Sequence, residues 1–472
     1  MRKLSAKWND TDKPWLLEWI ILGFIVSFCF IMFNHPDILA TSTHGMDLLD
    51  ITLKGRFFDF YDYTESTAVY HILIYIIFAV WSIPVYAVYG IAGIPLWGKL
   101  NYSEISYPVQ LWYKLLPCAF CIGAAYFLYK IGIEVGISRK KAKWMLFFYF
   151  SSPILIFSQL CFGQYDSISM FFTMYAIYAY MQKKYYKFSV LMAISIPLKL
   201  FSLFLFLPLL LLVEKRIIHI IKHCAIGMSI YLLNSLLFFN SQGLKDAKKF
   251  SSDMFGRFFL VGFQTIFGLV SFFLLGLAAL CIFCYLKKVD SEDKFSYCQW
   301  TIYVCLAAYS MLFMCILWHP QWVILLVPFL ILAAFMNDNF KMSVMILIAV
   351  SIGYLLLVFC NFPGNVDECL VNRGPLPHFI HRFLQGGKLK DYFTCPVFLD
   401  SNVFVTIFFG SLLINLIMKA PTKSRLESSR KLIAEDVLRV ERGYIWVHMF
   451  TIFIFIAPTM FIYFFRYIYP AA

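Results

Sequence analysis

Apolar runs recur along the whole chain and are separated by short polar stretches. Most of the runs are about 20 residues long, which lets a helix cross the hydrocarbon core of a bilayer. They do not show the alternation over about 10 residues that is typical of membrane β-barrel strands. The pattern therefore predicts an all-α polytopic membrane protein with about thirteen transmembrane helices.

Lys and Arg fall mostly in the short polar stretches, where they set the orientation of the neighbouring spans. The basic N-terminus and the cluster "SRKKAK" at 138–143 are predicted to be cytoplasmic, so the first span, 15–33, leads outward. Residues 35–107 then form one large first extracytoplasmic loop. Its apolar run 68–89 either crosses the membrane or lies in the interface, and its Pro and Gly breaks favour an interfacial or re-entrant helix.

Composition narrows the class of protein further. The chain is 61% hydrophobic, 14% charged and carries a formal net charge of +13. Cations spread over loops next to apolar runs indicate topology and membrane lipids as partners rather than nucleic acid. The fingerprints G-x-x-x-x-G-K-[ST] and G-x-G-x-x-G do not occur in the sequence, which argues against ATP-driven transport. Cys and His show no metal-ligand spacing.

Several polar side chains interrupt apolar surroundings on the predicted outer side. An ionisable group placed near a bilayer costs roughly 2.5–3.5 kcal/mol, so it indicates a functional site. Asp166, in the polar island Gly163–Ser167 between two apolar runs, is the first such group. Lys199 is the only charge in "FSVLMAISIPLKLFSLFLFLPLLLLV". The complete candidate set is His44, Asp47, Asp50, Gln164, Asp166, Lys199, His319, Gln321 and Trp322.

These residue types suit a substrate that combines a sugar with a lipid phosphate. A Lys offsets phosphate charge as a compact cation. A carboxylate takes the proton of an attacking hydroxyl, which is typically worth 10²–10⁴-fold in rate. A Trp stacks on a sugar face, and a Gln hydrogen-bonds to hydroxyl groups.

Four stretches of the chain resemble the GT-C superfamily of integral-membrane glycosyltransferases in their order and placement. They are the acidic first loop ending in "LKGRFFDFY", then "FGQYDSI", "SIPLKLFSLFLFLPL" and "HPQWVILLVPFL". Within that superfamily the chain is similar to the catalytic subunit of the first mannosyltransferase of glycosylphosphatidylinositol assembly and to bacterial mannosyltransferase-like proteins. The resemblance covers about residues 35–335. It implies a GT-C catalytic membrane module at 1–340 and a variable C-terminal transmembrane region at 341–472 with an outer loop at 362–401.

The resemblance also implies an activity. A hexose such as mannose passes with inversion from a polyprenyl-phosphate donor to a cell-surface glycan, glycolipid or protein, on the extracytoplasmic face of the cell membrane. The base is an outer-loop acid near the end of the first span. Related eukaryotic enzymes carry D-x-D there, whereas this chain has Asp47-Leu48-Leu49-Asp50, whose i, i+3 spacing puts both acids on one helical face. Either acid is therefore a candidate base, and dependence on a divalent metal stays open.

The remaining roles follow the same expectation. Asp166 orients the acceptor or stabilises charge, Lys199 holds the donor phosphate, and Gln321 and Trp322 contact the sugar or the lipid carrier. His44, Gln164 and His319 are further substrate-binding candidates.

Each candidate also has a purely structural interpretation. Asp166 suits a helix N-cap, Lys199 can snorkel to the interface, and Trp322 is typical of an interfacial belt. Asp47 and Asp50 can be solvated loop acids. For the cations of one outer loop we favour contact with anionic headgroups; these are Lys245, Lys248, Lys249 and Arg257.

Two other functions fit a polytopic protein. A secondary transporter or lipid-linked sugar flippase predicts inverted repeats and polar groups near the midplane. The sequence shows no two-half symmetry, and its candidate groups are predicted at one face. A non-catalytic scaffold does not account for the concentration of acids in the first outer loop.

Overall fold

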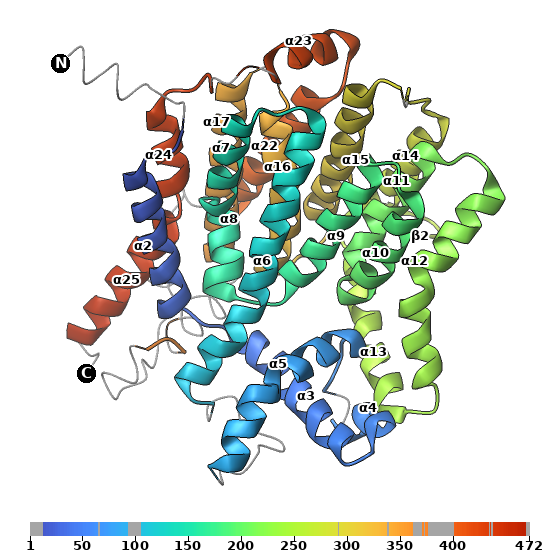
Figure 1. Ribbon diagram of the computed structural model, residues 1–472, viewed down its shortest axis with the longest axis vertical. Coiled ribbons are helices and arrows are strands. Elements are labelled where there is room, and N and C mark those ends of the chain that lie inside the picture. The colour runs from blue at the N-terminus through green and yellow to red at the C-terminus, as the bar shows by residue number, and fades with distance from the viewer. Residues whose placement is uncertain are drawn as a thin grey trace.

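The computed structural model describes residues 13–64, 67–92, 105–290, 292–337, 339–361, 371, 373–375, 401–433, 435 and 438–468. Figure 1 shows a bundle of helices with a smaller group, α3, α4, α5 and α13, at one end. Most of the predicted outer loop at 362–401 lies outside the described residues.

The first part of the chain leads from the bundle into the smaller group of helices and returns. Its elements are α2 (Leu16–Met32), α3 (Pro36–Leu53), the 3-10 turn η1 (Phe57–Asp59), α4 (Phe60–Tyr63), α5 (Ile72–Ile91) and α6 (Tyr107–Val135). The middle of the bundle follows as α7 (Arg139–Phe150), α8 (Pro153–Leu155), the π-helix η3 (Ile156–Phe162), α9 (Asp166–Met181), α10 (Tyr185–Leu198), η4 (Leu200–Ser202) and α11 (Leu203–Val213).

The second half of the chain completes the bundle. Its elements are α12 (Ile217–Leu237), α13 (Gln242–Gly256), η5 (Arg257–Phe259), β1 (Gly262–Thr265), β2 (Gly268–Ser271), α14 (Phe272–Leu286), α15 (Lys294–Cys315), η6 (Pro320–Leu326), α16 (Val327–Phe335), α17 (Phe340–Asn361), α22 (Ser401–Lys419), α23 (Lys423–Ile433), α24 (Arg442–Phe450) and α25 (Phe453–Ile468).

The described helices fit a multi-pass membrane protein. Six of them are long and apolar enough to cross a bilayer, or up to nine if each of three bent helix pairs is one span. This confirms the polytopic helical class, while the thirteen crossings and the GT-C fold stay predictions. Helix α5 meets the length and composition of a span, so the interfacial placement of the run 68–89 also stays a prediction.

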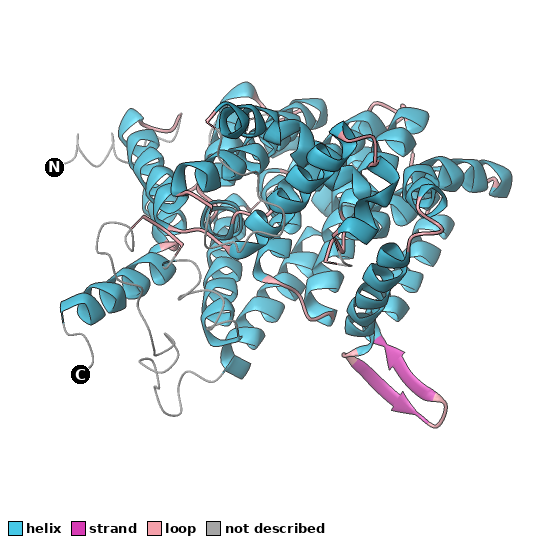
Figure 2. Ribbon diagram, turned by 90° about the horizontal axis from the view of Figure 1, so that it is seen from below, coloured by secondary structure: helices cyan, strands magenta, loops and turns pink. Residues whose placement is uncertain are grey.

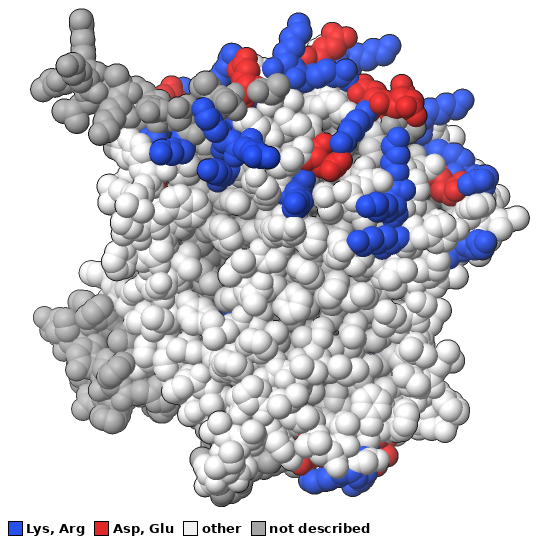
Figure 3. Space-filling view, viewed as in Figure 1, with Lys and Arg blue, Asp and Glu red and all other residues white. Residues whose placement is uncertain are grey.

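Charged side chains mark the two ends of the molecule. Figure 3 shows most of the Lys and Arg gathered at one end, a smaller charged group at the opposite end, and a belt of other residues between them. We call the first of these the basic end; it includes α23 (Figure 1). An uncharged belt between charged rims is what a lipid bilayer requires of a protein surface.

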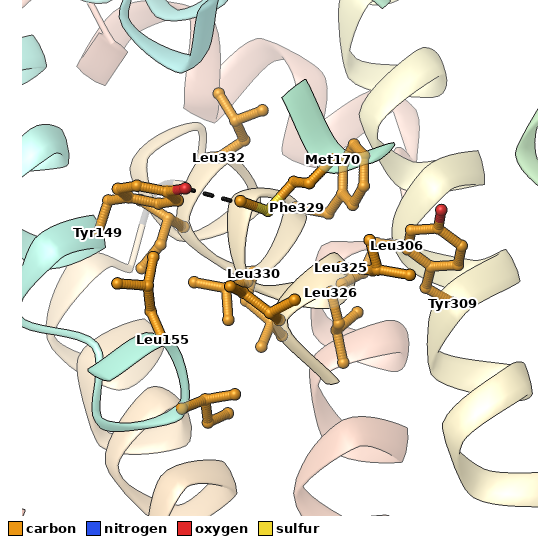
Figure 4. Close-up of a cluster of buried hydrophobic side chains, with 14 of the residues drawn as sticks. Tyr149, Leu155, Met170, Leu306, Tyr309, Leu325, Leu326, Phe329, Leu330 and Leu332 are labelled. Carbon is orange, nitrogen blue, oxygen red and sulfur yellow. Dashed lines mark hydrogen bonds between the residues drawn. The ribbon is translucent and has the colours of Figure 1, made fainter. Parts of the chain in front are cut away.

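The core lies where helices from distant parts of the sequence meet. Figure 4 shows Tyr149 of α7, Met170 of α9, Leu306 of α15 and Phe329 of α16 converging on one cluster of buried side chains. The Tyr149 hydroxyl donates to Met170 Sδ at 3.9 Å, so this polar atom has a partner inside the apolar cluster. The helices beside this cluster are thereby held in fixed positions relative to one another.

One short hairpin departs from the helical class. Strands β1 and β2 pair antiparallel in the register Gly262↔Ser271 to Thr265↔Gly268. Figure 2 shows the hairpin projecting from the side of the bundle. Its turn residues Ile266 and Phe267 are 92% and 94% exposed.

Candidate functional site

Four segments that start toward the basic end lose regular helical structure as they approach the opposite end. Helix α2 ends at Met32, η3 at Phe162, α10 at Leu198 and α15 at Cys315. Prolines and a glycine cause the breaks: Pro36 and Pro320 begin new helices, Pro197 precedes the end of α10, and Gly163 has φ +77°. Interrupted helices at membrane depth are tolerated where the backbone is buried in protein or lines a cavity.

A cavity of about 510 Å³ lies at these breaks. Its walls come from the first loop, α10, η4, α12, α13, η5 and the segment before η6. The polar residues that line it are Asp37, Tyr70, His71, Tyr165, Lys199, Tyr231, Asn234, Ser235, Lys248, Arg257, His319 and Gln321, with Trp322 among the apolar ones. The volume suits a small organic ligand or a monosaccharide with part of its lipid carrier.

Asp166 and Lys199 form a buried ion pair at the wall of the cavity. Lys199 Nζ lies 2.7 Å from Asp166 Oδ1, and the two side chains are 10% and 2% exposed. Asp166 begins α9, whereas Lys199 follows Pro197 in extended backbone with φ −154° and ψ 113°. That extended residue turns the Lys side chain toward the acid, so the pair exists because α10 is interrupted.

The Lys199 ammonium lies close to aromatic side chains. Its Nζ lies 5.0 Å from the ring centroid of Trp322 and 5.4 Å from that of Tyr165. The guanidinium of Arg257 lies over the same Trp322 ring at 5.7 Å. Two cations therefore lie near one indole ring. In the described part of the chain, no carboxylate lies within ion-pair distance of Arg257.

Asp37 supplies a second carboxylate to the cavity. It lies in the first turn of α3, just past the corner that ends the candidate span α2, where His35 caps the helix by accepting from the Asp37 backbone N–H at 3.2 Å. Burial raises the pKa of Asp37 to about 6, with Lys199 acting to lower it and Asp166 to raise it. Its side chain is 39% exposed and lines the cavity, where it is accessible to a ligand.

Neutral polar side chains form a short hydrogen-bonded chain at the same site. Gln321 Nε2 donates to Gln164 Oε1 at 2.6 Å, and Gln164 Nε2 donates to the Tyr70 hydroxyl at 3.4 Å. Gln321 Oε1 is buried without a hydrogen-bond partner among the described residues, so it can accept from a ligand hydroxyl. Burial lowers the pKa of His319 to about 4, and the charges of Arg257 and Lys199 lower it further in the same sense. His319 is therefore neutral at pH 7.

Six of the nine residues predicted from the sequence meet at this site. Lys199, His319, Gln321 and Trp322 line the cavity, while Asp166 and Gln164 stand directly behind them and hold Lys199 and Gln321. The other three lie further along α3: His44 pairs with Asp47 at 3.5 Å, and Asp50 pairs with Lys54 at 2.6 Å.

The structure does not bring the predicted bases, Asp47 and Asp50, to the cavity wall. They follow Asp37 by ten and thirteen residues on one helix, which is about 15–20 Å at a rise of 1.5 Å per residue. Asp50 instead accepts from the Tyr86 hydroxyl at 3.4 Å besides pairing with Lys54. Their catalytic role stays a prediction without support from the geometry.

Sequence reasoning missed three charged residues of the cavity, Asp37, Lys248 and Arg257. Asp37 is the first acid after the first span, and the segment "NHPDIL" carries a Pro–Asp helix start that could have revealed it. Arg257 was assigned to lipid headgroups with the neighbouring lysines. Nothing in the sequence near Arg257 indicates that its side chain folds back over Trp322, because that contact joins η5 to η6 across the fold.

Comparisons with known proteins do not identify a family for this chain, and the described side chains do not indicate a metal site. A comparison with protein-family models and a search of curated proteins find no match to this chain. Among the residues that the structure describes, no group of three or more His, Cys, Asp or Glu side chains is arranged to hold a metal ion.

Proposed function

We propose that the chain is an integral-membrane inverting glycosyltransferase, which moves a hexose such as mannose from a polyprenyl-phosphate sugar to a hydroxyl of a glycan, glycolipid or protein. The observation that carries the proposal is one cavity lined by Asp37, Lys199, Arg257 and Trp322, with walls that include α3 and α13 of the smaller helix group opposite the basic end (Figure 1). By the positive-inside rule the end that carries this helix group is extracytoplasmic. The resemblance to GT-C enzymes supports the same activity.

Asp37 suits the role of general base better than any other acid. A base works best when its pKa lies near the working pH, and burial raises the pKa of Asp37 to about 6. Asp166 is committed to Lys199 at 2.7 Å. In the proposed reaction Asp37 accepts the proton of the acceptor hydroxyl. The oxygen of that hydroxyl forms the new bond to the anomeric carbon. The bond from that carbon to the phosphate oxygen breaks, and polyprenyl phosphate leaves with the electron pair.

Two cations accommodate the leaving phosphate. Asp166 offsets the charge of Lys199, and this pairing orients Lys199 inside the protein. Arg257 has no such carboxylate among the described residues, so its charge is available to the donor, and its planar guanidinium matches a phosphate in two-point geometry. The Trp322 ring lies close to both cations, at 5.0 Å and 5.7 Å, and its apolar surface is available to the sugar or to the first isoprene units.

The proposal is tested with purified protein in liposomes. Polyprenyl-phosphate hexose carrying a radiolabelled sugar should release polyprenyl phosphate and transfer label to an acceptor or to water. Asp37→Asn should lower the rate by roughly 10²-fold or more. Asp59→Asn is a matched control, because Asp59 is an exposed acid of the same loop paired with Arg56.

The same assay distinguishes the alternatives. If Asp47→Asn or Asp50→Asn lowers the rate and Asp37→Asn does not, the base is Asp47 or Asp50 and not Asp37. If labelled lipid moves between leaflets without loss of its sugar, the protein is a flippase and the transferase proposal fails.

A further inference from the structure

Helix α6 carries a buried lysine that the cavity does not use. Lys114 is fully buried, and no carboxylate of the described residues lies within ion-pair distance of it. Its Nζ donates instead to two main-chain oxygens, Phe30 O at 2.7 Å and Phe33 O at 2.5 Å. Both belong to the end of α2, where carbonyl groups have no partner within the helix.

These carbonyls lie at the corner between α2 and α3. The two helices are bent by 66°, so the last turn of α2 cannot pass its hydrogen bonds on to α3. Inside a membrane protein such carbonyls need donors, because lipid supplies none. A lysine ammonium can donate to two of them at once, and Lys114 does so.

Contacts from two other directions hold the same corner. Gln110, one turn before Lys114 on α6, accepts from Asn34 Nδ2 at 2.7 Å. The ring of His35 stacks on Phe162 at 3.7 Å between centroids, and its Nδ1 accepts from the Asp37 backbone N–H. Contacts therefore hold the corner at Phe33, Asn34, His35 and the Asp37 backbone N–H.

Gly163 sets the space for Lys114. A Cβ built on Gly163 would lie 3.2 Å from Lys114 Cε, and the residue has φ +77°, which disfavours any side chain. The start of the polar island at 163–167 therefore packs against the lysine stem while its Asp166 holds Lys199. One short segment thus contacts two lysines, Lys114 through Gly163 and Lys199 through Asp166.

We propose that Lys114 is a positioning residue that holds the α2–α3 corner so that the Asp37 carboxylate faces the cavity. This inference rests on the proposed function, in which Asp37 is the base. Only three residues lie between Phe33 and Asp37, so loss of the ammonium lets the corner relax and displaces the carboxylate. Displacement of a catalytic group by about 1 Å can cost 10²-fold in rate.

Lys114→Met, which keeps the stem length and removes the donors, is the main test. We expect kcat to fall roughly 10–100-fold, with KM for the donor within about twofold, because Lys199, Arg257 and Trp322 are untouched. The midpoint of the kcat/KM–pH profile should fall from about 6 toward about 4, the usual range of a solvated Asp. The ionisable groups that face Asp37 are otherwise unchanged: His35, Tyr70, Asp166, Lys199 and His319.

Lys141→Met is the matched control. Lys141 is also a buried lysine that donates to a main-chain oxygen, Leu432 O at 2.6 Å, but it lies at the basic end. We expect it to lower thermal stability without moving the pH midpoint. An equal shift in both variants, or no shift in Lys114→Met, overturns the assignment.

A second readout does not depend on activity. With Asp37→Cys, the rate of modification by a charged, membrane-impermeant thiol reagent should rise about tenfold when Lys114→Met is added, after subtraction of the parent protein's own thiols. If Lys114→Met fails to fold, Gln110→Leu tests the same corner with a smaller expected increase. An unchanged rate overturns the positioning role. An inactive wild-type protein with the expected rise in reactivity overturns the proposed function and keeps the role of Lys114.

Discussion

At the scale of single residues, its position distinguishes Asp37 from the other acids of the first loop. The chain has several acids in the first loop, yet the one at the α2–α3 corner lines the cavity and has a pKa raised to about 6 by burial. Asp50, in the same helix, pairs with an exposed lysine. Catalytic bases are commonly carboxylates that face a ligand cavity and have a pKa raised toward neutrality.

The pH dependence of transfer follows from that pKa. A base acts in its ionised form, so kcat/KM should be constant above about pH 7 and should fall about tenfold per pH unit below about 6. His319, with a pKa lowered to about 4, stays neutral over this range. Initial rates measured from pH 4.5 to pH 8 check the prediction, and a profile that is flat down to pH 5 contradicts it.

The Asp166–Lys199 pair can be separated into a structural and a functional part. Asp166→Asn leaves a buried lysine without its counter-charge and should destabilise the protein by roughly 3–5 kcal/mol. Adding Lys199→Met removes the charge and should restore much of the stability, because an apolar replacement of a buried pair is often neutral. Transfer should be lost in the double variant as well.

Thermal unfolding in detergent and the transfer assay measure these two parts independently. Recovered stability together with recovered activity in the double variant would show that Lys199 serves the fold alone.

At the scale of elements, a second buried pair joins the two ends of the chain. Glu18 of α2 and Arg442 of α24 are both fully buried and lie 2.7 Å apart. Trp446 Nε1 donates to Glu18 at 3.1 Å, and the Arg442 guanidinium lies 3.8 Å from the ring centroid of Trp15. The pair lies about 20 Å along α2 from the corner that carries Asp37.

Breaking this pair should affect stability and not catalysis. Glu18→Gln should cost roughly 3–5 kcal/mol because it leaves a buried guanidinium uncompensated. Glu435→Gln is the matched control, since the exposed i, i+4 pair with Arg439 is worth about 0.3–0.5 kcal/mol. Unfolding midpoints and activity per folded molecule decide the outcome; a large loss of kcat at unchanged stability would contradict a purely structural role.

At the scale of the whole molecule, the distribution of charge predicts how the protein sits in the membrane. The end with most of the Lys and Arg is expected in the cytoplasm. The cavity has walls from α3 and α13, which belong to the helix group at the other end. A bilayer between the two ends fits the uncharged belt of Figure 3.

Thiol labelling in intact cells checks this orientation. With Arg139→Cys, an exposed position at the start of α7, an impermeant reagent should react after the cells are opened and not before. With Lys54→Cys, whose side chain is 64% exposed in the first loop, the same reagent should react with intact cells. The reverse pattern would place the cavity on the cytoplasmic side.

The sequence by itself determined the class of this protein and six residues of its candidate site, Asp166 and Lys199 among them. Long apolar runs require helices, since a bilayer leaves backbone groups no other partner, and charges inside apolar runs indicated Asp166 and Lys199 because they are costly there. Both signals are local, so they can be read without a fold. The approach of "HPQW" to this pair was also expected from its place after an outward span.

Only the tertiary structure decided which acid of the first loop meets the pair, and which cation accompanies it. Asp37 reaches the cavity because α2 and α3 meet at 66°, and Arg257 does so because η5 returns over Trp322. Bend angles and returns of this kind arise from packing between segments distant in sequence. No periodicity or residue spacing carries that information, so Asp47 and Asp50 were the natural expectation and Asp37 emerged from the fold.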